Sequence, residues 1–237
     1  MRRTALAAAI AALSCAPAWA DPVNWADWSG GVVGIDGSAS GSFVTAGGEL
    51  VDIRYRGEIA FLQDGVNANV TDYFVQGNPP PYTSALVDNR PPAAEMIALS
   101  TATTKTLSFS RPVDNLFFAV VSLNGNGYQF DHDFEVVSTG CGYWGCGGLE
   151  KVDLGNGSFQ ANSTGGEPHG VIRFTGAVSS ITWTSLTDEY WNGFTVGTYG
   201  LAPVPEPATA LMAAAGLVLL GAAARRRRGE AGCLPAG

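Results

Sequence analysis

The C-terminal part of the chain carries an uninterrupted apolar run, Ala208–Ala224, which is followed at once by four arginines. As an α-helix this run would span roughly 25 Å, slightly less than the ~30 Å hydrocarbon core of a bilayer. Arginines are costly in lipid and stay on the cytoplasmic side of a membrane. We therefore expect a single C-terminal transmembrane helix that leaves everything before Pro205 outside the cytoplasm.

The residues around this run form a pattern of three parts. A Pro-Glu-Pro motif precedes the run and a basic cluster follows it, in the order Pro205, Glu206, Pro207, then Arg225, Arg226, Arg227 and Arg228. Residues 204–228 thereby resemble the PEP-CTERM sorting signal of Gram-negative bacteria, and residues 229–237 form a short additional tail. The resemblance implies recognition by an exosortase, an integral membrane processing enzyme. An ordinary C-terminal membrane anchor is the alternative, and both interpretations export the body of the protein.

The N-terminus indicates export independently. Met1–Arg3 supplies a basic segment, Thr4–Leu13 an apolar segment and Ala18–Ala20 an Ala-x-Ala cleavage site. These are the three parts of a secretory signal peptide, which we place at residues 1–20. Cys15 leaves a lipoprotein signal as the alternative.

Between the two terminal signals lies a body of one-domain length, residues 21–203. The whole chain has a formal charge of −8, with 13 basic and 21 acidic residues. Six of the basic residues and two of the acidic ones lie in the terminal segments, which leaves seven against nineteen and a body charge of −12. A surface this acidic repels nucleic acid and anionic membranes, and it suits divalent cations or neutral glycans.

The body holds one pair of cysteines, Cys141 and Cys146. In an oxidising compartment, and with glycines that allow a tight bend between them, we expect these two to form a disulfide. The spacing differs from the Cys-x-x-Cys pattern of redox-active dithiols. We expect the bridge to hold Tyr143 and Trp144, which lie between the cysteines, in one presentation.

The hydrophobic pattern of the body has the period of β-strands. Residues 49–59 alternate so that Val51, Ile53 and Tyr55 share one face, and residues 113–121 are apolar on both faces, as in a central strand. Further strands are expected at Val32–Ile35, Ser42–Thr45, Glu95–Ser100, Lys105–Phe109, Tyr128–Val137, Leu149–Leu154, Gly157–Ala161, Gly170–Phe174, Ser179–Leu186 and Gly193–Tyr199.

Many short strands with Gly-rich turns predict an all-β fold, an antiparallel β-sandwich of jelly-roll type. Asn156-Gly157 between two strand-like runs predicts a hairpin. The segment Asn67–Pro92 contains Pro79–Pro81 and cannot be a central strand, so we expect a long surface excursion there.

The search for catalytic residues gives few candidates. His132 and His169 are the only two histidines, so neither a serine triad nor a zinc site has an evident set of residues. A glycoside hydrolase needs two carboxylates at a fixed separation, for which Glu58, Glu135 and Glu189 are candidates. Solvated surface charge is the simpler interpretation of these carboxylates, and we expect no enzymatic activity.

Asp131 and Asp133 are a candidate metal site. At positions i and i+2 of an extended strand they would face the same side, so with Asp188 or Glu189 they could hold a structural calcium ion. We expect no other cofactor. The alternative is an edge strand that outward charges protect from further pairing.

Four aromatic residues form a candidate glycan-binding site: Tyr143 and Trp144 on the disulfide loop, and Tyr190 and Trp191 in a turn-like stretch. Their rings could stack on the apolar faces of sugars while neighbouring Asp and Asn side chains bind the hydroxyls. Trp183 lies inside a strand pattern and is expected in the core. The alternative is that the loop aromatics only cap the end of the sandwich.

Together these features predict an exported, non-catalytic protein of the cell surface or extracellular matrix. The PEP-CTERM resemblance implies an association with exopolysaccharide and biofilm, and the body suits a structural or glycan-binding module. We expect transient residence in the inner membrane and then release to the periplasm, cell surface or medium. A secreted carbohydrate-active hydrolase is the alternative.

Overall fold

The computed structural model describes residues 22–65 and 70–201. The expected signal peptide at residues 1–20, the Pro-Glu-Pro motif, the C-terminal transmembrane helix and the tail lie outside the described residues. Within the described ranges no helix is long and apolar enough to cross a membrane.

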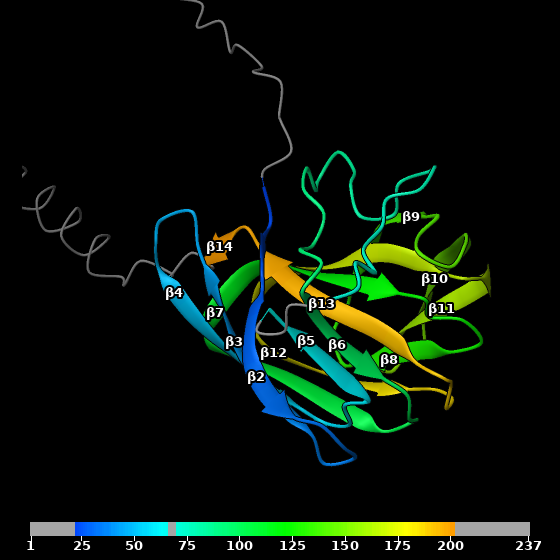
Figure 1. The fold of residues 1–237 in the computed structure, drawn as a ribbon, viewed down its shortest axis with the longest axis horizontal. Helices are drawn as coiled ribbons and strands as arrows, with labels where there is room; N and C mark the ends of the chain where they lie inside the picture. Colours follow the sequence, from blue (N-terminus) through cyan, green and yellow to red (C-terminus); the bar gives the residue numbers. More distant parts are fainter. Residues whose placement is uncertain (1–21, 66–69, 202–237) are drawn as a thin grey trace, which may run out of the picture. The chain divides into compact units, whose positions relative to one another are not determined.

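The described chain is all-β and antiparallel (Figure 1). It forms fourteen strands and no helix within the described ranges. The strands are β1 (Asn24–Trp25), β2 (Asp27–Val32), β3 (Ser38–Val44), β4 (Leu50–Arg56), β5 (Phe61–Asp64), β6 (Glu95–Leu99), β7 (Thr104–Val121), β8 (Gly127–Phe130), β9 (Glu135–Gly140), β10 (Gly147–Asp153), β11 (Phe159–Gly166), β12 (His169–Ser185), β13 (Asn192–Thr198) and β14 (Gly200–Leu201).

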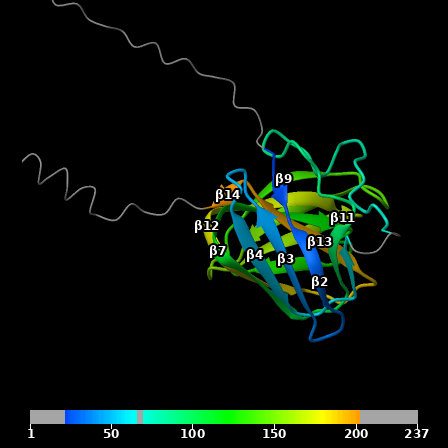
Figure 2. The same cartoon turned by 60° about the vertical axis from the view of Figure 1, so that its left-hand side comes forward.

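The strand pairing gives two layers that share their two longest strands. Layer A has the order β2-β3-β4-β7-β12-β8-β11-β10 and uses the first half of β7 with the second half of β12. Layer B has the order β5-β6-β13-β7-β12-β9 and uses the opposite halves of the same two strands. Figure 2 shows β2, β3 and β4 of layer A side by side with β7. The strands form one continuous antiparallel sheet in which two long strands pass from one layer to the other, an arrangement consistent with the expected β-sandwich.

The inner faces of the two layers meet in an aromatic core. Phe118 of layer B stacks on its neighbour Phe194, with 4.8 Å between ring centroids, and meets Trp183 of layer A edge-on at 5.4 Å. Tyr55 of layer A reaches Phe194 at 5.6 Å. Trp183 is 1% exposed, so its expected place in the core is confirmed. These contacts bury the alternating apolar residues that the sequence places on one face of each strand.

The central strands of layer B, β6, β13 and the second half of β7, are buried on both faces, as the doubly apolar pattern of residues 113–121 predicts for β7. Alternate residues of β7 belong to two separate apolar clusters. Leu116, Phe118 and Val120 face layer A, whereas Phe117, Ala119 and Val121 face the other side. That outer side is covered by Phe74, Tyr82 and Val87 of the long segment before β6, each fully buried. The expected surface excursion therefore packs on the sheet and forms a second, smaller core.

Several strand boundaries differ from the sequence-based expectation. The expected strands 105–109 and 113–121 are one continuous strand, β7, and 170–174 and 179–186 are likewise one, β12. Both bend where the chain passes between layers, and the β7–β12 register shifts between Phe174 and Ala177 and between Val178 and Ser180. Pro112 and Gly176, which fall between the expected strands, lie at these corners, because a bend tolerates a missing ladder hydrogen bond or a positive φ.

The expected single strand Tyr128–Val137 is wrong, because the structure has two separate strands there. It divides into β8 and β9, which pair with different halves of β12. Among the others, β2 ends at Val32, where a strand was expected to begin, and β5 was not expected at all. The hairpin at Asn156-Gly157 is confirmed, because β10 and β11 pair antiparallel across it.

Phe118 is the test of the two-layer packing. Replacing it by Ala should lower the free energy of unfolding by about 3–5 kcal/mol, because the change leaves a cavity where rings of both layers meet. Urea denaturation of the full chain in detergent, followed by circular dichroism, measures the effect.

Val44→Ala is the matched control, since Val44 is 58% exposed and should change stability by less than about 0.5 kcal/mol. A loss for Phe118→Ala no larger than that of the control would contradict the described core.

Candidate functional site

The disulfide loop forms as expected. Cys141 and Cys146 are bonded, and the backbone N–H of Gly142 donates to the carbonyl of Gly145 at 2.7 Å. Two backbone hydrogen bonds fix the loop to the proline-rich segment: Gly77 N–H donates to the Cys141 carbonyl at 2.8 Å, and Cys141 N–H donates to the Pro79 carbonyl at 2.9 Å. The disulfide therefore closes the loop, and the hydrogen bonds with Gly77 and Pro79 attach it to the proline-rich segment.

Gly142 is required by a close approach. A Cβ at this position would lie 2.4 Å from the His169 ring. His169 is fully buried, and its Nδ1 lies 2.9 Å from the Tyr82 hydroxyl. Burial lowers the pKa of His169 to about 4, so it stays neutral at ordinary pH. His169 is a packing residue beneath the loop, and His132 is exposed beside Asp131.

Three of the four predicted aromatic residues belong to one cluster of rings. Trp144 meets Trp191 with 4.7 Å between centroids, and Tyr143 meets Trp144 at 4.9 Å. Tyr73 lies among them, 5.0 Å from Tyr143, 5.4 Å from Trp144 and 4.9 Å from Trp191. Phe61 of β5 completes the cluster through Trp191, at 4.9 Å. Tyr73 was not expected from the sequence, because it lies in the long segment before β6, distant in sequence from the other rings.

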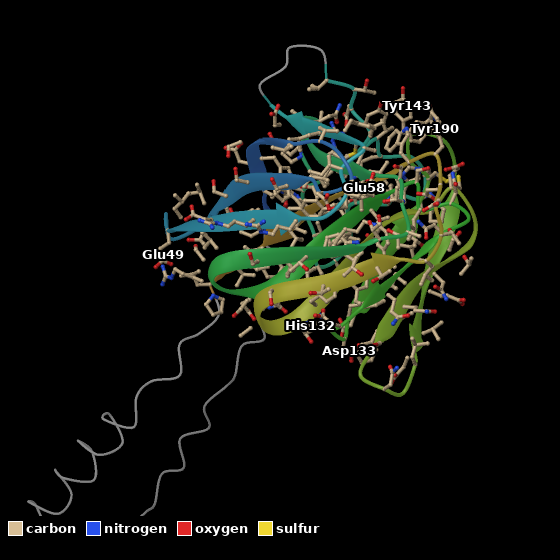
Figure 3. The ribbon with its side chains drawn as sticks, turned by 90° about the horizontal axis from the view of Figure 1, so that it is seen from below. Glu49, Glu58, His132, Asp133, Tyr143 and Tyr190 are labelled. Atoms are coloured by element: carbon tan, nitrogen blue, oxygen red, sulfur yellow. A yellow bond between two sulfur atoms is a disulfide. The ribbon has the colours of Figure 1, made fainter. Side chains whose placement is uncertain are left out.

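The fourth residue, Tyr190, lies 94% exposed beside this cluster. Figure 3 shows Tyr190 and Tyr143 in the same region of the molecule, and His132 and Asp133 apart from them. A cleft of about 220 Å³ opens here, and its lining residues are Ser122, Asn124, Trp144, Glu167, Tyr190 and Trp191. These residues lie in four loops: the disulfide loop, the loop after β7, the loop before β12 and the loop before β13. The strands β7, β12 and β13 are neighbours in layer B.

Glu167 is the charged group of the cleft. Its Oε2 accepts hydrogen bonds from the Ser122 hydroxyl at 2.5 Å and from Asn124 Nδ2 at 2.7 Å, and its Oε1 accepts from Asn124 Nδ2 at 2.8 Å. Ser122 has a φ of 55°, a left-handed conformation that is uncommon outside glycine and that clusters at functional sites. In this conformation the Ser122 hydroxyl points toward the Glu167 carboxylate.

Glu189 lies next to the cleft but does not line it. Burial raises the pKa of Glu189 to about 7, a hydrogen bond from Asn192 opposes the rise, and the charge of Glu167 adds to it. Its Oε1 accepts from Asn192 Nδ2, and Asn192 Oδ1 accepts from the Tyr128 hydroxyl. Its Oε2 is buried with no hydrogen-bond partner in the part of the chain that the structure describes. Near neutral pH this carboxyl is partly protonated.

The other two candidate carboxylates have structural roles. Glu58 is buried and accepts hydrogen bonds from the backbone N–H groups of Ser100 and Thr101 and from the Ser100 hydroxyl. Glu135 forms an ion pair with Arg173 at 2.6 Å. Neither lines the aromatic cleft.

The geometric premise of the calcium site is wrong. Asp131 and Asp133 follow the end of β8 and do not lie on a strand. Asp131 accepts a hydrogen bond from Thr182 N–H at 2.9 Å, and Asp133 is paired with Lys151. Asp188, the suggested third ligand, accepts from Ala102 N–H at 2.6 Å. No group of three His, Cys, Asp or Glu side chains that could hold a metal occurs within residues 22–65 and 70–201.

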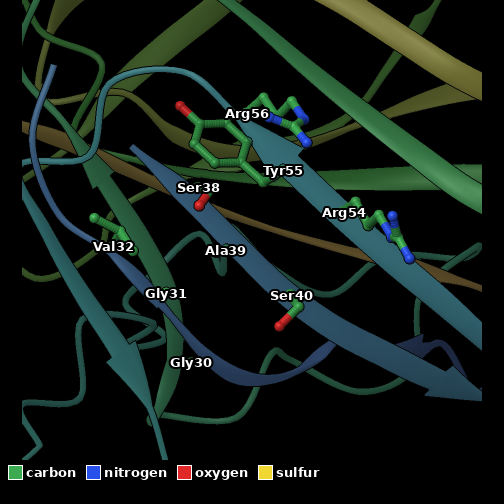
Figure 4. Close-up of a pocket in the computed structure, with 9 residues that line it drawn as sticks. All are labelled: Gly30, Gly31, Val32, Ser38, Ala39, Ser40, Arg54, Tyr55 and Arg56. Carbon is green, nitrogen blue, oxygen red and sulfur yellow. The ribbon is translucent and has the colours of Figure 1, made fainter. Parts of the chain in front are cut away.

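A larger hollow lies on the outer face of layer A (Figure 4). It measures about 490 Å³, and its lining includes Gly30, Gly31, Ser38, Ser40, Arg54 and Arg56. Tyr55 also borders it but is 1% exposed, so its ring is not available to a ligand. This hollow is a shallow depression over small side chains, and it lacks the accessible rings of the smaller cleft.

Comparison with known families identifies the C-terminal signal. The family described as the PEP-CTERM protein-sorting motif matches residues 203–228. The chain carries a PEP-CTERM sorting signal. The signal supports export of the body to the cell envelope or surface and processing by an exosortase, a membrane enzyme. No match was found among curated proteins or among solved structures.

The raised pKa of Glu189 has a consequence for stability. The folded state holds this proton more tightly than the unfolded chain, so the contribution of Glu189 is fully present below about pH 4.5 and is lost as pH rises through 7. Glu189→Gln mimics the protonated acid. Between about pH 4.5 and pH 7 the free energy of unfolding of this variant should therefore fall less steeply than that of the wild type. The loss that the wild type shows and the variant does not should be up to about 3 kcal/mol.

Urea denaturation at a series of pH values measures the free energy of unfolding of both proteins. In the difference between the two curves, the titration of all other groups cancels. Glu150→Gln, at an exposed position on β10, should follow the wild-type curve. Parallel curves for the wild type and Glu189→Gln would show that Glu189 has an ordinary pKa.

Proposed function

We propose that the exported body is a non-catalytic module that binds glycans through the cleft around Trp144 and Trp191, in association with exopolysaccharide at the cell surface or in the surrounding matrix. The observation that carries this proposal is the joining of accessible rings and polar groups in one cleft. Tyr190 and Trp144 are exposed, and Ser122, Asn124 and Glu167 lie beside them.

This combination suits the chemistry of sugars. A pyranose ring has apolar C–H faces, which stack on aromatic side chains, and an equatorial rim of hydroxyls, which needs hydrogen-bond partners. The cleft of about 220 Å³ is smaller than the roughly 300–1,000 Å³ of pockets that enclose a drug-sized ligand. It suits one sugar unit of a chain that continues across the surface.

The cleft is also preorganised. The disulfide closes the loop that carries Trp144, and the loop is hydrogen-bonded to the proline-rich segment. Contacts with Tyr73 and Trp191 hold the Trp144 ring from two sides. A side chain that is already ordered loses little conformational entropy on binding, so more of the contact energy is retained as affinity.

The sorting signal and the acidic body fit an extracellular role. With a body charge of −12, the protein remains soluble and does not adhere to anionic membranes after release. We expect the inner membrane to hold the chain only until processing, after which the body reaches the periplasm, the surface or the medium.

A hydrolase is the second candidate, and one observation favours it. Glu189 has a raised pKa, to which the charge of Glu167 contributes, and glycoside hydrolysis uses a protonated carboxyl with a second carboxyl nearby. Glu189 does not line the cleft, which favours binding alone. Product analysis after incubation with the bound glycan separates the two candidates, because binding without turnover discards the hydrolase.

Loss of either tryptophan should weaken glycan binding. Trp144→Ala and Trp191→Ala each remove a stacking surface, and each should lower affinity up to about tenfold, since an aromatic contact contributes about 0.5–1.5 kcal/mol. Calorimetry with a glycan selected on an array measures the effect.

Leu154→Ala is the control, because Leu154 is 39% exposed and lies outside the cleft. Unchanged affinity in both tryptophan variants would assign the binding to another surface.

The sorting signal can be tested separately from the cleft. In a host with an exosortase, Glu206→Ala should leave the intact chain in the membrane fraction, because the Pro-Glu-Pro motif that marks the processing region is broken. Immunoblots of membrane and medium fractions measure the distribution. Glu230→Ala, which changes a carboxylate in the tail after the signal, is the matched control, and equal release of both variants would contradict the role of the motif.

A further inference from the structure

The cleft contains one charged side chain and no cation. Glu167 is the only Asp, Glu, Lys or Arg among its lining residues. In the ranges that the structure describes, Glu167 forms no ion pair, although four other acidic side chains pair with Arg or Lys. The negative charge of the cleft is therefore not neutralised by the protein.

The hydrogen bonds to Glu167 hold it without cancelling its charge. Both donors, Ser122 and Asn124, are neutral. A carboxylate has about four acceptor positions, and three are used, two on Oε2 and one on Oε1. Oε1 retains an acceptor position for a donor from outside the protein.

The rings around Glu167 favour the same kind of ligand. Trp144, Trp191 and Tyr190 line the cleft together with the carboxylate. The face of an aromatic ring carries a negative quadrupole that attracts cations, most strongly for tryptophan. A carboxylate and several aromatic rings in one small cleft form a site for a positively charged group.

From these observations we infer that the cleft recognises glycans that carry a protonated amine, that is, deacetylated amino sugars. The ammonium group binds Glu167 Oε1 and the sugar ring stacks on the tryptophans. This inference rests on the proposed glycan-binding function and specifies its ligand.

The same chemistry excludes two other classes of sugar. A uronic acid places its carboxylate against Glu167 and meets like-charge repulsion in an acidic body. An N-acetylated sugar presents a neutral amide, which adds bulk in a small cleft and forms no charge-assisted hydrogen bond. Neutral sugars retain the stacking contacts and bind more weakly.

Matched oligosaccharides test the inference. Hexamers on β-1,4 and β-1,6 backbones are compared in three forms that differ only at carbon 2: hydroxyl, free amine and acetamide. The probe protein is the full chain in mild detergent, and calorimetry at about pH 6 keeps the amine protonated. The amine form should bind about tenfold more tightly than the hydroxyl form, because only the ammonium group forms a charge-assisted hydrogen bond with the carboxylate.

Glu167→Gln separates the charge from the shape of the cleft. This variant should lose the preference for the amine and retain binding of the hydroxyl form, because the rings are unchanged. Asp36→Asn, at an exposed position outside the cleft, is the charge-matched control and should keep the preference. Added salt should weaken the amine form more than the hydroxyl form.

The outcomes distinguish this inference from the proposed function. Equal affinity for the amine and hydroxyl forms, or an unchanged preference in Glu167→Gln, overturns the inference and leaves glycan binding intact. Absence of binding to every oligosaccharide overturns both. Binding of choline without binding of the amine-bearing hexamer also overturns the inference, because it assigns the cation site to another class of ligand.

Discussion

The antiparallel pairing of β7 with β12 is the interaction on which the rest of the structure depends. The two strands pair from Thr104 opposite Thr184 to Val120 opposite Gly170, and the ladder is irregular at the bend, where both pass from layer A to layer B. Every other strand joins this pair directly or through a neighbour. Because the same two strands belong to both layers, the layers cannot separate without breaking this ladder, and the aromatic core between them is fixed by the covalent chain as well as by burial.

The position of the cleft follows from this pairing. β7 ends, and β12 and β13 begin, at the same end of layer B, so the loops that carry Ser122, Glu167 and Trp191 must converge there. The disulfide loop reaches the same place because β9, which precedes it, pairs with the first half of β12. The sheet thus positions loops of unrelated sequence. Substitutions in such loops can change the ligand that is bound without disrupting the fold.

The sequence predicted the features that are local. Alternation identified the buried face of β4, and the double apolar pattern identified β7 as central. The disulfide was expected because Cys141 and Cys146 are the only cysteine pair of an exported body, with glycines between them. The sequence also named three of the cleft residues, because exposed loop aromatics are unusual enough to notice. It missed Ser122, Asn124 and Glu167, since each looks like an ordinary loop residue until the fold brings residues 122–124 and 167 together. Tyr73 was missed for the same reason. β7 and β12 were each expected as two shorter strands, because a local sequence signal cannot distinguish a bend within a strand from its end.

A small cleft on a surface protein has a particular physical consequence for a polymeric ligand. Its single-site affinity is limited by the few groups that one sugar unit can contact, and loss of translational freedom offsets much of that contact energy. A polysaccharide, however, repeats its unit many times, so a released cleft finds the next unit at a high effective concentration, and several protein copies on one strand bind as a multivalent set. Retention in a matrix therefore does not require a deep pocket. It requires a rigid, accessible cleft of the right charge, and the rings held by the disulfide loop beside Glu167 meet that requirement.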